Sequence, residues 1–161
     1  MNNEVIRLSK ITKKFIANNK EINVLDKINL KINKGELVSL TGPSGSGKST
    51  LLHIIALLDQ PTNGEVFFKN KNFSKSSDND KDLVRKKGIS IIYQQHNLLS
   101  DFTALENVMM PLLNLGLPKD ESERKAKTTL SLVHLSNRID HFPSQLSGGE
   151  QQRVAVARAI I

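Results

Sequence analysis

A run of glycine, serine and lysine at residues 42–50, GPSGSGKST, has the composition of a phosphate-binding loop. It fits the pattern G-x-x-x-x-G-K-[ST], between an apolar segment at residues 37–40 and a helix-like segment at residues 51–58. Glycines let the backbone turn tightly and aim successive N–H groups at one point. The start of the following helix adds a positive dipole end. The loop therefore predicts a cradle for a polyphosphate.

Two side chains of this loop have defined chemistry toward a nucleoside triphosphate. Lys48 can reach the β- and γ-phosphates, and the hydroxyl of Ser49 can ligate Mg²⁺. The predicted nucleotide contacts come from Gly42, Pro43, Ser44, Gly45, Ser46, Gly47, Lys48, Ser49 and Thr50. The alternative, a Gly/Ser-rich turn that binds nothing, requires the fixed positions of the pattern to coincide by chance.

A second helix start rich in glycine lies at residues 146–153, LSGGEQQR. Ser147 and Glu150 have the spacing of a capping box, and apolar residues follow them. Gly148 and Gly149 leave the first turn without side chains, so its free N–H groups could approach a phosphate. Alone, this motif could simply cap a helix. Together with the phosphate loop, it favours a second phosphate contact.

The elements around these motifs predict an α/β fold. Residues 5–11, 24–32 and 65–68 read as strands, and residues 37–40 and 89–93 read as strands buried on both faces. The succession of strand, loop, helix and strand implies a parallel sheet.

From Gln94 onward the pattern becomes helical. Thr103 and Glu106 form a capping box for a helix over residues 105–115, and a second helix fits residues 120–133.

Composition excludes several classes of protein. The chain has 161 residues, enough for one domain, and no cysteine, so it has neither a disulfide framework nor a thiolate metal site. Its four histidines share no metal-ligand spacing. The longest apolar run, residues 54–58, is far shorter than the roughly 20 residues that span a bilayer. We therefore expect a cytoplasmic protein that is soluble by itself.

The net charge of +7 lies entirely in residues 1–87. Its lysines are scattered among asparagines without interleaved aromatic residues, which is more typical of a solvated surface than of a nucleic-acid-binding patch. We therefore expect no nucleic-acid partner.

Taken together, the motifs resemble those of the nucleotide-binding subunits of ABC transporters. The phosphate loop corresponds to the Walker A motif, Gln94 to the Q-loop, and LSGGEQQR to the signature motif. Lys48 and Gln94 are 46 positions apart, and Gln94 and Ser147 are 53 apart, as in a compact transporter ATPase. Residues 91–108, IIYQQHNLLSDFTALENV, are most similar to the ATPase branch of the lipoprotein-releasing system, followed by the macrolide-exporter branch.

The resemblance implies one ABC ATPase domain over residues 1–161. A P-loop NTPase core with an N-terminal antiparallel β-subdomain would occupy residues 1–93, a Q-loop and α-helical subdomain residues 94–146, and the signature helix residues 147–161. The family continues with a strand ending in Asp-Glu, which supplies the catalytic glutamate. That segment, the D-loop and the switch histidine do not occur in this sequence. With the C-terminal part of the fold missing, we expect these 161 residues to bind ATP weakly or not at all, and not to hydrolyse it.

The resemblance also implies roles for single residues. Gln94 would ligate Mg²⁺ with Ser49 and sense the γ-phosphate. Phe15 would stack on adenine, the alternative being that it fills the core. His134 stands where the family commonly has a helix-ending glycine.

The implied partners are a second copy of the chain and a membrane protein. In a head-to-tail homodimer, ATP bound to one subunit would be contacted in trans by Ser147, Gly148, Gly149 and Glu150. Integral membrane transporter subunits would dock between Leu98 and Val108, unless this stretch serves only to pack the helical subdomain.

The implied function is ATP binding and hydrolysis coupled to release of lipoproteins, by a peripheral subunit on the cytoplasmic face of the inner membrane. One alternative is a soluble ABC ATPase that acts on nucleic acid or the ribosome. The interval between Gln94 and Ser147 lacks the long coiled coil or zinc module usual in such proteins. The other alternative is a truncated, non-hydrolysing remnant.

Overall fold

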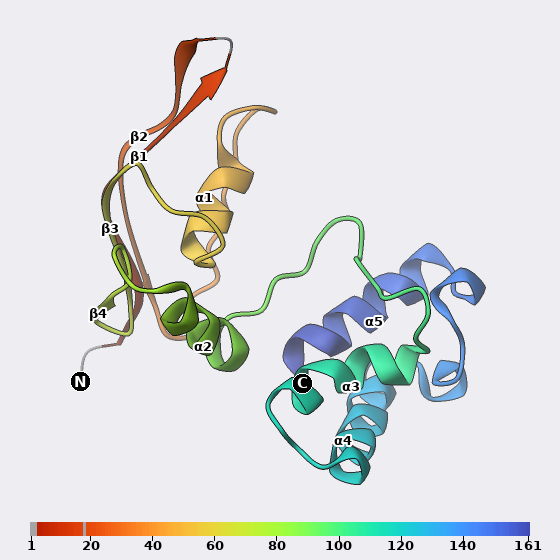
Figure 1. Cartoon of the computed structure of the whole chain (residues 1–161). Helices are drawn as coiled ribbons and strands as arrows, with labels where there is room; N and C mark the ends of the chain where they lie inside the picture. The colour runs from red at the N-terminus through yellow and green to blue at the C-terminus, as the bar shows by residue number, and fades with distance from the viewer. Residues whose placement is uncertain (1–2, 18) are drawn as a thin grey trace. The chain divides into compact units, whose positions relative to one another are not determined.

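A computed structural model describes residues 3–17 and 19–161 of the chain. They form two units, Met1–Arg85 and Lys86–Ile161. The first is built on a β-sheet and the second on helices (Figure 1).

The sheet of the first unit is antiparallel throughout, with the strand order β2-β1-β3-β4. Its strands are β1 (Glu4–Ala17), β2 (Lys20–Asn33), β3 (Asn63–Phe68) and β4 (Lys71–Asn72). The long β1–β2 hairpin contains both N-terminal strands that the sequence predicts. This sheet matches the antiparallel β-subdomain that the resemblance implies.

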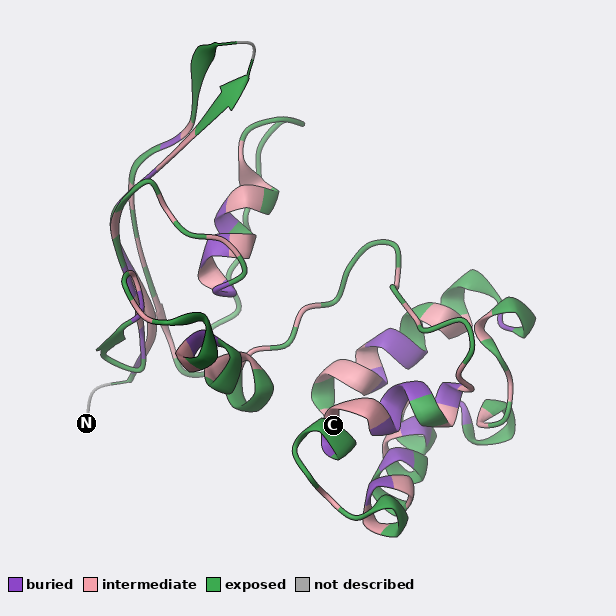
Figure 2. Cartoon of the chain, in the orientation of Figure 1, coloured by how far each residue is buried: buried purple, intermediate pink, exposed green. Residues whose placement is uncertain are grey.

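The first unit also contains the helix α1 (Lys48–Ile55) and most of α2 (Asp78–Gly88), whose last turn extends past Arg85. Leu51 and Ile54 are the buried residues of α1, and the most buried side chains of β1 are Leu8 and Ile11. Figure 2 shows buried residues along the strands and on α1. The helix that follows the phosphate loop is therefore anchored by apolar contacts.

Two strands that the sequence predicts are not formed. Residues 37–40 and 89–93 have no regular secondary structure, and the side chain of Leu37 is fully exposed, with a relative exposure of 102%. A strand exists through hydrogen bonds to neighbouring strands. Neither segment pairs with a strand among the described residues, so the predicted parallel sheet does not form there.

The second unit is a cluster of three α-helices and two 3-10 turns. In chain order they are α3 (Ala104–Asn114), α4 (Lys119–Leu132), η1 (Ser136–Arg138), η2 (Pro143–Gln145) and α5 (Gly148–Ile160). One core joins the helices, built from Ala104, Val108, Met109, Ala126, Leu130, Leu135, Leu146, Val154 and Ala157. The three helices predicted after Gln94 are confirmed. The first two begin at Ala104 and Lys119, each one residue before the predicted start, and the third begins at Gly148, inside the signature motif.

No helix in the described part of the chain is both long enough and apolar enough to cross a membrane.

Candidate nucleotide site

The phosphate loop has the backbone conformation that its glycines allow. Gly45 and Gly47 have φ values of 80° and 85°, in the left-handed region. Gly47 is the N-cap of α1, and a Cβ placed on it would lie 2.9 Å from both the Leu25 Cδ2 atom and the Val24 carbonyl oxygen. Only glycine permits both this φ and this approach to β2. The loop is therefore held against the sheet at the residue that starts the helix.

Lys48 is folded back over the loop. Its Nζ atom donates hydrogen bonds to the carbonyl oxygens of Gly42, at 2.8 Å, and Pro43, at 2.6 Å, with a longer contact of 3.5 Å to the Ser46 Oγ atom. The ammonium thus lies among the groups that line the loop. Replacing these neutral oxygens by phosphate oxygens would give stronger, charge-assisted hydrogen bonds.

The rest of the loop is accessible to a ligand. Ser44, Ser46 and Ser49 are exposed, and no acidic residue lies in the first turn of α1. A helix start without a carboxylate keeps its N–H groups and its positive dipole end available to an anion. The exposed serines and the free helix start are compatible with the polyphosphate that the sequence predicts.

Phe15 lies on the exposed hairpin and not in the core. Its side chain is 43% exposed, and it pairs with Ile22 on β2. The Lys13 Nζ atom lies 5.0 Å from the centroid of its ring. The core-filling alternative is therefore wrong, and a ring face is available for stacking.

The signature turn is a complete capping box at the start of α5. The Ser147 Oγ atom accepts a hydrogen bond from the Glu150 N–H at 3.3 Å, and the Glu150 carboxylate accepts from the Ser147 N–H at 2.8 Å. The Ser147 hydroxyl also lies 2.8 Å from the same carboxylate oxygen, Oε2. Ser147, Gly148 and Gly149 are exposed. The predicted cap is confirmed, and the turn is open to an approaching ligand.

Arg138, in η1, holds the other oxygen of Glu150. Its Nε atom donates to Glu150 Oε1 at 3.0 Å. Hydrogen bonds from Ser147 and Arg138 lower the pKa of Glu150 from its ordinary value of 4.5 to about 2. Glu150 is therefore ionised at any physiological pH.

Gln94 belongs to the second unit and is exposed in a turn. Two residues further on, the backbone is tied to α5. The guanidinium of Arg158 donates to the carbonyl oxygens of His96 and Asn97, each at 2.9 Å. The end of the Q-loop is thus bonded directly to the helix that begins at the signature motif.

The stretch between Leu98 and Val108 divides into a buried and an exposed part. Ala104, Asn107 and Val108 are fully buried and belong to the interior of the second unit. Leu99 is 42% exposed, and its neighbours Ser100 and Asp101 are also exposed. Within this stretch, the described structure leaves mainly residues 99–101 available to a partner.

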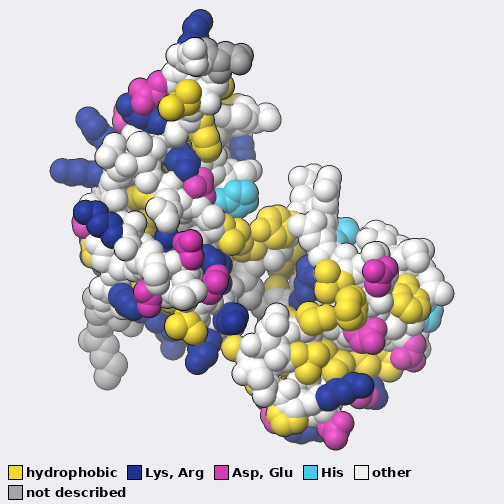
Figure 3. Space-filling model, in the orientation of Figure 1, with side chains coloured by type: hydrophobic (Ala, Val, Ile, Leu, Met, Phe, Trp, Pro, Cys, Tyr) yellow, Lys and Arg dark blue, Asp and Glu magenta, His cyan; other side chains and the backbone are white. Residues whose placement is uncertain are grey.

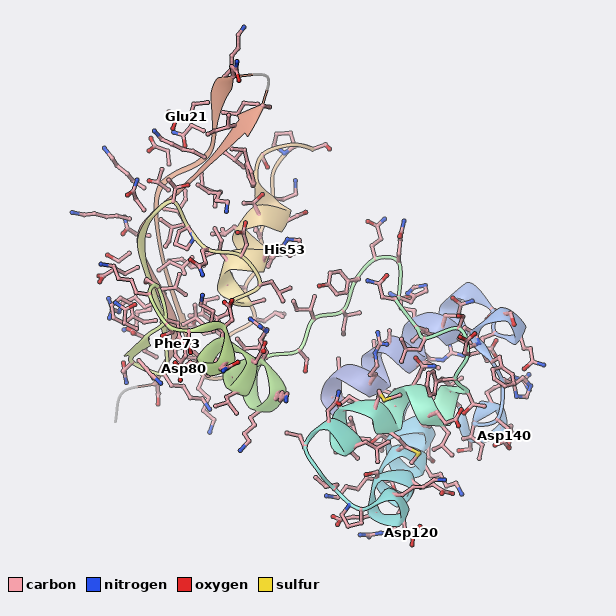
Figure 4. The ribbon with its side chains drawn as sticks, in the orientation of Figure 1. Glu21, His53, Phe73, Asp80, Asp120 and Asp140 are labelled. Carbon is pink, nitrogen blue, oxygen red and sulfur yellow. The ribbon has the colours of Figure 1, made fainter. Side chains whose placement is uncertain are left out.

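Metal binding by acidic or histidine clusters has no support in the described residues, where no group of three or more His, Asp or Glu side chains could hold an ion. His53, for example, lies on α1 (Figure 4).

Basic side chains are numerous on the visible face of the first unit (Figure 3). Several are paired with acids, as in the contacts of Lys13 with Asp59 and Lys14 with Glu21.

Sequence reasoning missed Arg138 and Arg158. Each donates hydrogen bonds to a partner that is distant in sequence. Arg138 binds Glu150, and Arg158 binds the carbonyl oxygens of His96 and Asn97. No local pattern in the sequence identifies either arginine, because the partner of each lies at least 12 positions away.

Comparison with known proteins agrees with this geometry. The family model described as "ABC transporter" matches residues 25–161. The lipoprotein-releasing system ATP-binding proteins LolD of Rickettsia bellii and Rickettsia typhi are 48% and 50% identical over all 161 residues. That of Saccharophagus degradans is 46% identical. In each case the match covers 100% of this chain and 71% of the relative.

Among solved structures, the chain is similar to the ATP-binding cassette MJ0796, in a dimeric post-hydrolysis state bound to ADP and Pi. The TM-score is 0.90 at 42% identity, over 96% of this chain and 68% of that one. A second dimeric structure of MJ0796, described as a bacterial ABC transporter cassette, matches equally well.

Proposed function

The chain belongs to the ABC transporter family, and from this premise we propose that it is the ATP-binding subunit of a lipoprotein-releasing system. ATP binding and hydrolysis by this subunit would drive release of lipoproteins from the inner membrane through integral membrane partners. The observation that carries the proposal is the phosphate loop, with Lys48 among its carbonyl oxygens and Gly47 against β2. The branch is supported by 46–50% identity to three LolD proteins.

In this proposal the loop N–H groups and Lys48 bind the β- and γ-phosphates, and the Ser49 hydroxyl holds Mg²⁺. Mg²⁺ would neutralise charge that develops on the transferred phosphoryl group. Phe15 would stack on adenine with its exposed ring face. The signature turn of a second copy would contact the γ-phosphate in a head-to-tail dimer, through the Ser147 hydroxyl and the backbone of Gly148, Gly149 and Glu150, with the Glu150 carboxylate directed away from it.

The nucleotide site is tested by Lys48→Ala. Loss of charge-assisted hydrogen bonds to phosphate is worth about 2–3 kcal/mol, equivalent to roughly 30- to 150-fold weaker ATP binding. Titration with a fluorescent ATP analogue measures this change, and it is carried to high concentration because these 161 residues are expected to bind ATP weakly. The matched control is Lys34→Ala, because Lys34 is an exposed lysine of the same unit outside the loop. Equal affinities of the two variants would contradict the assignment of the loop.

Docking to a membrane partner is proposed at residues 99–101, the exposed part of the stretch between Leu98 and Val108. The chain contains no cysteine, so a single introduced cysteine can carry a crosslinker without background. Leu99→Cys should crosslink to an integral membrane protein in inner-membrane vesicles. Leu132→Cys is the control, because Leu132 is 71% exposed at the end of α4. Crosslinking from both positions, or only from Leu132→Cys, would contradict the docking site.

The branch assignment has a separate test in the host. Replacing the protein by its Lys48→Ala variant should leave lipoproteins in the inner-membrane fraction that otherwise reach the outer membrane. Normal lipoprotein distribution, with ATP binding abolished, would place the protein in another branch of the family. Salt-dependent binding of the protein to DNA or ribosomes would favour the soluble alternative.

A further inference from the structure

An acidic side chain lies beside the turn at which the phosphate is proposed to arrive. Glu150 is in the first turn of α5, directly after Gly148 and Gly149, and it is ionised. Its carboxylate accepts the Ser147 N–H, and its negative charge repels an anion that approaches the turn. The signature turn of this chain therefore needs a compensating cation if it is to accept a phosphate.

Arg138 is placed to supply that cation. It binds Glu150 Oε1 at 3.0 Å, which leaves Oε2 to accept both the N–H and the hydroxyl of Ser147 at 2.8 Å. The two carboxylate oxygens thus have separate partners, one cationic and one in the signature turn. Within the described residues, the other members of the polar hollow around this pair are Ser131, His134, Ser136 and Asn137. None of them carries a permanent positive charge. Another arginine, Arg153, has its Nη1 atom 3.9 Å from the position of a Cβ on Gly149, but the arginine that bonds the Glu150 carboxylate is Arg138.

We propose that Arg138 is a positioning residue of the signature turn, which cancels the charge of Glu150 so that the turn can accept a phosphate from a second subunit. Arg138 itself does not contact the phosphate. It also keeps Oε1 occupied, so that Oε2 remains on Ser147 and the serine stays in its capping position. The proposal rests on the proposed function, because it takes the signature turn to act in trans on bound ATP.

A purely structural ion pair makes a different prediction from charge compensation. If the pair only ties η1 to α5, then Glu150→Gln and Arg138→Gln should have similar effects, and combining them should not restore function. If Arg138 compensates a charge, Arg138→Gln is harmful only while Glu150 is acidic. Gln retains the capping box at this position, so Glu150→Gln removes the charge without removing the cap.

The test is ATP-dependent self-association of the protein, followed by sedimentation velocity with Mg²⁺ chelated so that ATP is not consumed. Arg138→Gln should weaken association roughly tenfold at low salt, and the deficit should shrink as salt screens the uncompensated charge. The Arg138→Gln/Glu150→Gln double variant should recover most of the loss. ATP affinity of the single protomer should stay at the wild-type value. Arg124→Gln is the matched control, because Arg124 is an exposed arginine on α4 of the same unit.

A further variant separates failure of this inference from failure of the proposed function. Gly148→Asp should abolish association if the signature turn acts in trans. If it does so while Arg138→Gln associates like the wild type, the inference about Arg138 is wrong and the proposed function stands. If the double variant is as defective as Arg138→Gln, charge compensation is wrong. If Gly148→Asp has no effect, the head-to-tail arrangement itself is refuted. Circular dichroism of each variant establishes that it is folded.

Discussion

Asn107 offers the sharpest test of how the second unit is held together. Its side chain is fully buried near the start of α3. The Oδ1 atom accepts the Leu99 N–H at 2.8 Å. The Nδ2 atom donates to the carbonyl oxygens of Leu99, Phe102 and Thr103 at 3.1, 3.0 and 3.0 Å. One side chain thus fixes the backbone of the loop that precedes α3.

The cost of Asn107→Ala follows from which of these groups keep a partner. The Leu99 carbonyl also accepts the Phe102 N–H, and the Thr103 carbonyl also accepts the Asn107 N–H. The Leu99 N–H and the Phe102 carbonyl depend on the Asn107 side chain. Two partly buried groups left without a partner cost about 1–2 kcal/mol each, the lower part of the range for buried groups, because Leu99 is 42% exposed. Alanine returns about 0.5 kcal/mol through its higher helix propensity. We expect a net loss of about 1.5–3.5 kcal/mol in the free energy of unfolding.

Urea denaturation followed by circular dichroism at 222 nm measures this loss, because most of the helix lies in the second unit. The matched control is Asn114→Ala, an exposed asparagine at the end of the same helix, which should change stability by less than about 0.5 kcal/mol. A loss for Asn107→Ala no larger than that of Asn114→Ala would refute the reasoning. Such a result would mean that the loop backbone finds other partners or becomes hydrated.

Three further predictions concern backbone strain and pH. Gly47→Ala should lower the free energy of unfolding by at least about 2 kcal/mol, because residue 47 has a φ of 85° and its Cβ would lie only 2.9 Å from β2. Gly35→Ala should lower it by about 1 kcal/mol, because residue 35 has a similar φ of 82° but open space around it. His134→Gly should stabilise the second unit by about 0.5–1 kcal/mol, because His134 has a φ of 58° after α4. The pKa of Glu150 is lowered from 4.5 to about 2, so its stabilising contribution is present above pH 4.5 and is lost as the pH falls toward 2. Stability of Glu150→Gln should therefore fall less on acidification than that of the wild type.

Urea denaturation at fixed pH tests the first two of these predictions, and denaturation at pH 7 and pH 3 tests the third. Equal losses for the two glycine variants would mean that the contact of Gly47 with β2 relaxes at no cost. A destabilising His134→Gly would mean that the histidine side chain makes a contact that outweighs its backbone strain. Parallel pH profiles for Glu150→Gln and the wild type would exclude Glu150 as a source of acid sensitivity.

The helix starts were predictable because the interactions that define them are local. Thr103 with Glu106, and Ser147 with Glu150, bond across three residues, and both capping boxes occur as the spacing predicts. The phosphate loop is similar, since its glycine positions and Lys48 bond within the loop itself. For these features, residue type and spacing already contain the partners that form the structure.

Features that depend on distant partners were decided only by the tertiary structure. Residues 37–40 and 89–93 have the composition of buried strands, yet a strand needs a neighbour to receive its hydrogen bonds, and none pairs with them in the described residues. The Arg138–Glu150 pair likewise joins residues 12 positions apart through a 3-10 turn. Residue type and spacing are therefore enough to predict the tight phosphate loop and the capped start of α5, because the bonds that form them are local. The tertiary structure decided which strands form and which cation faces the signature carboxylate, because those contacts require the chain to fold back on itself.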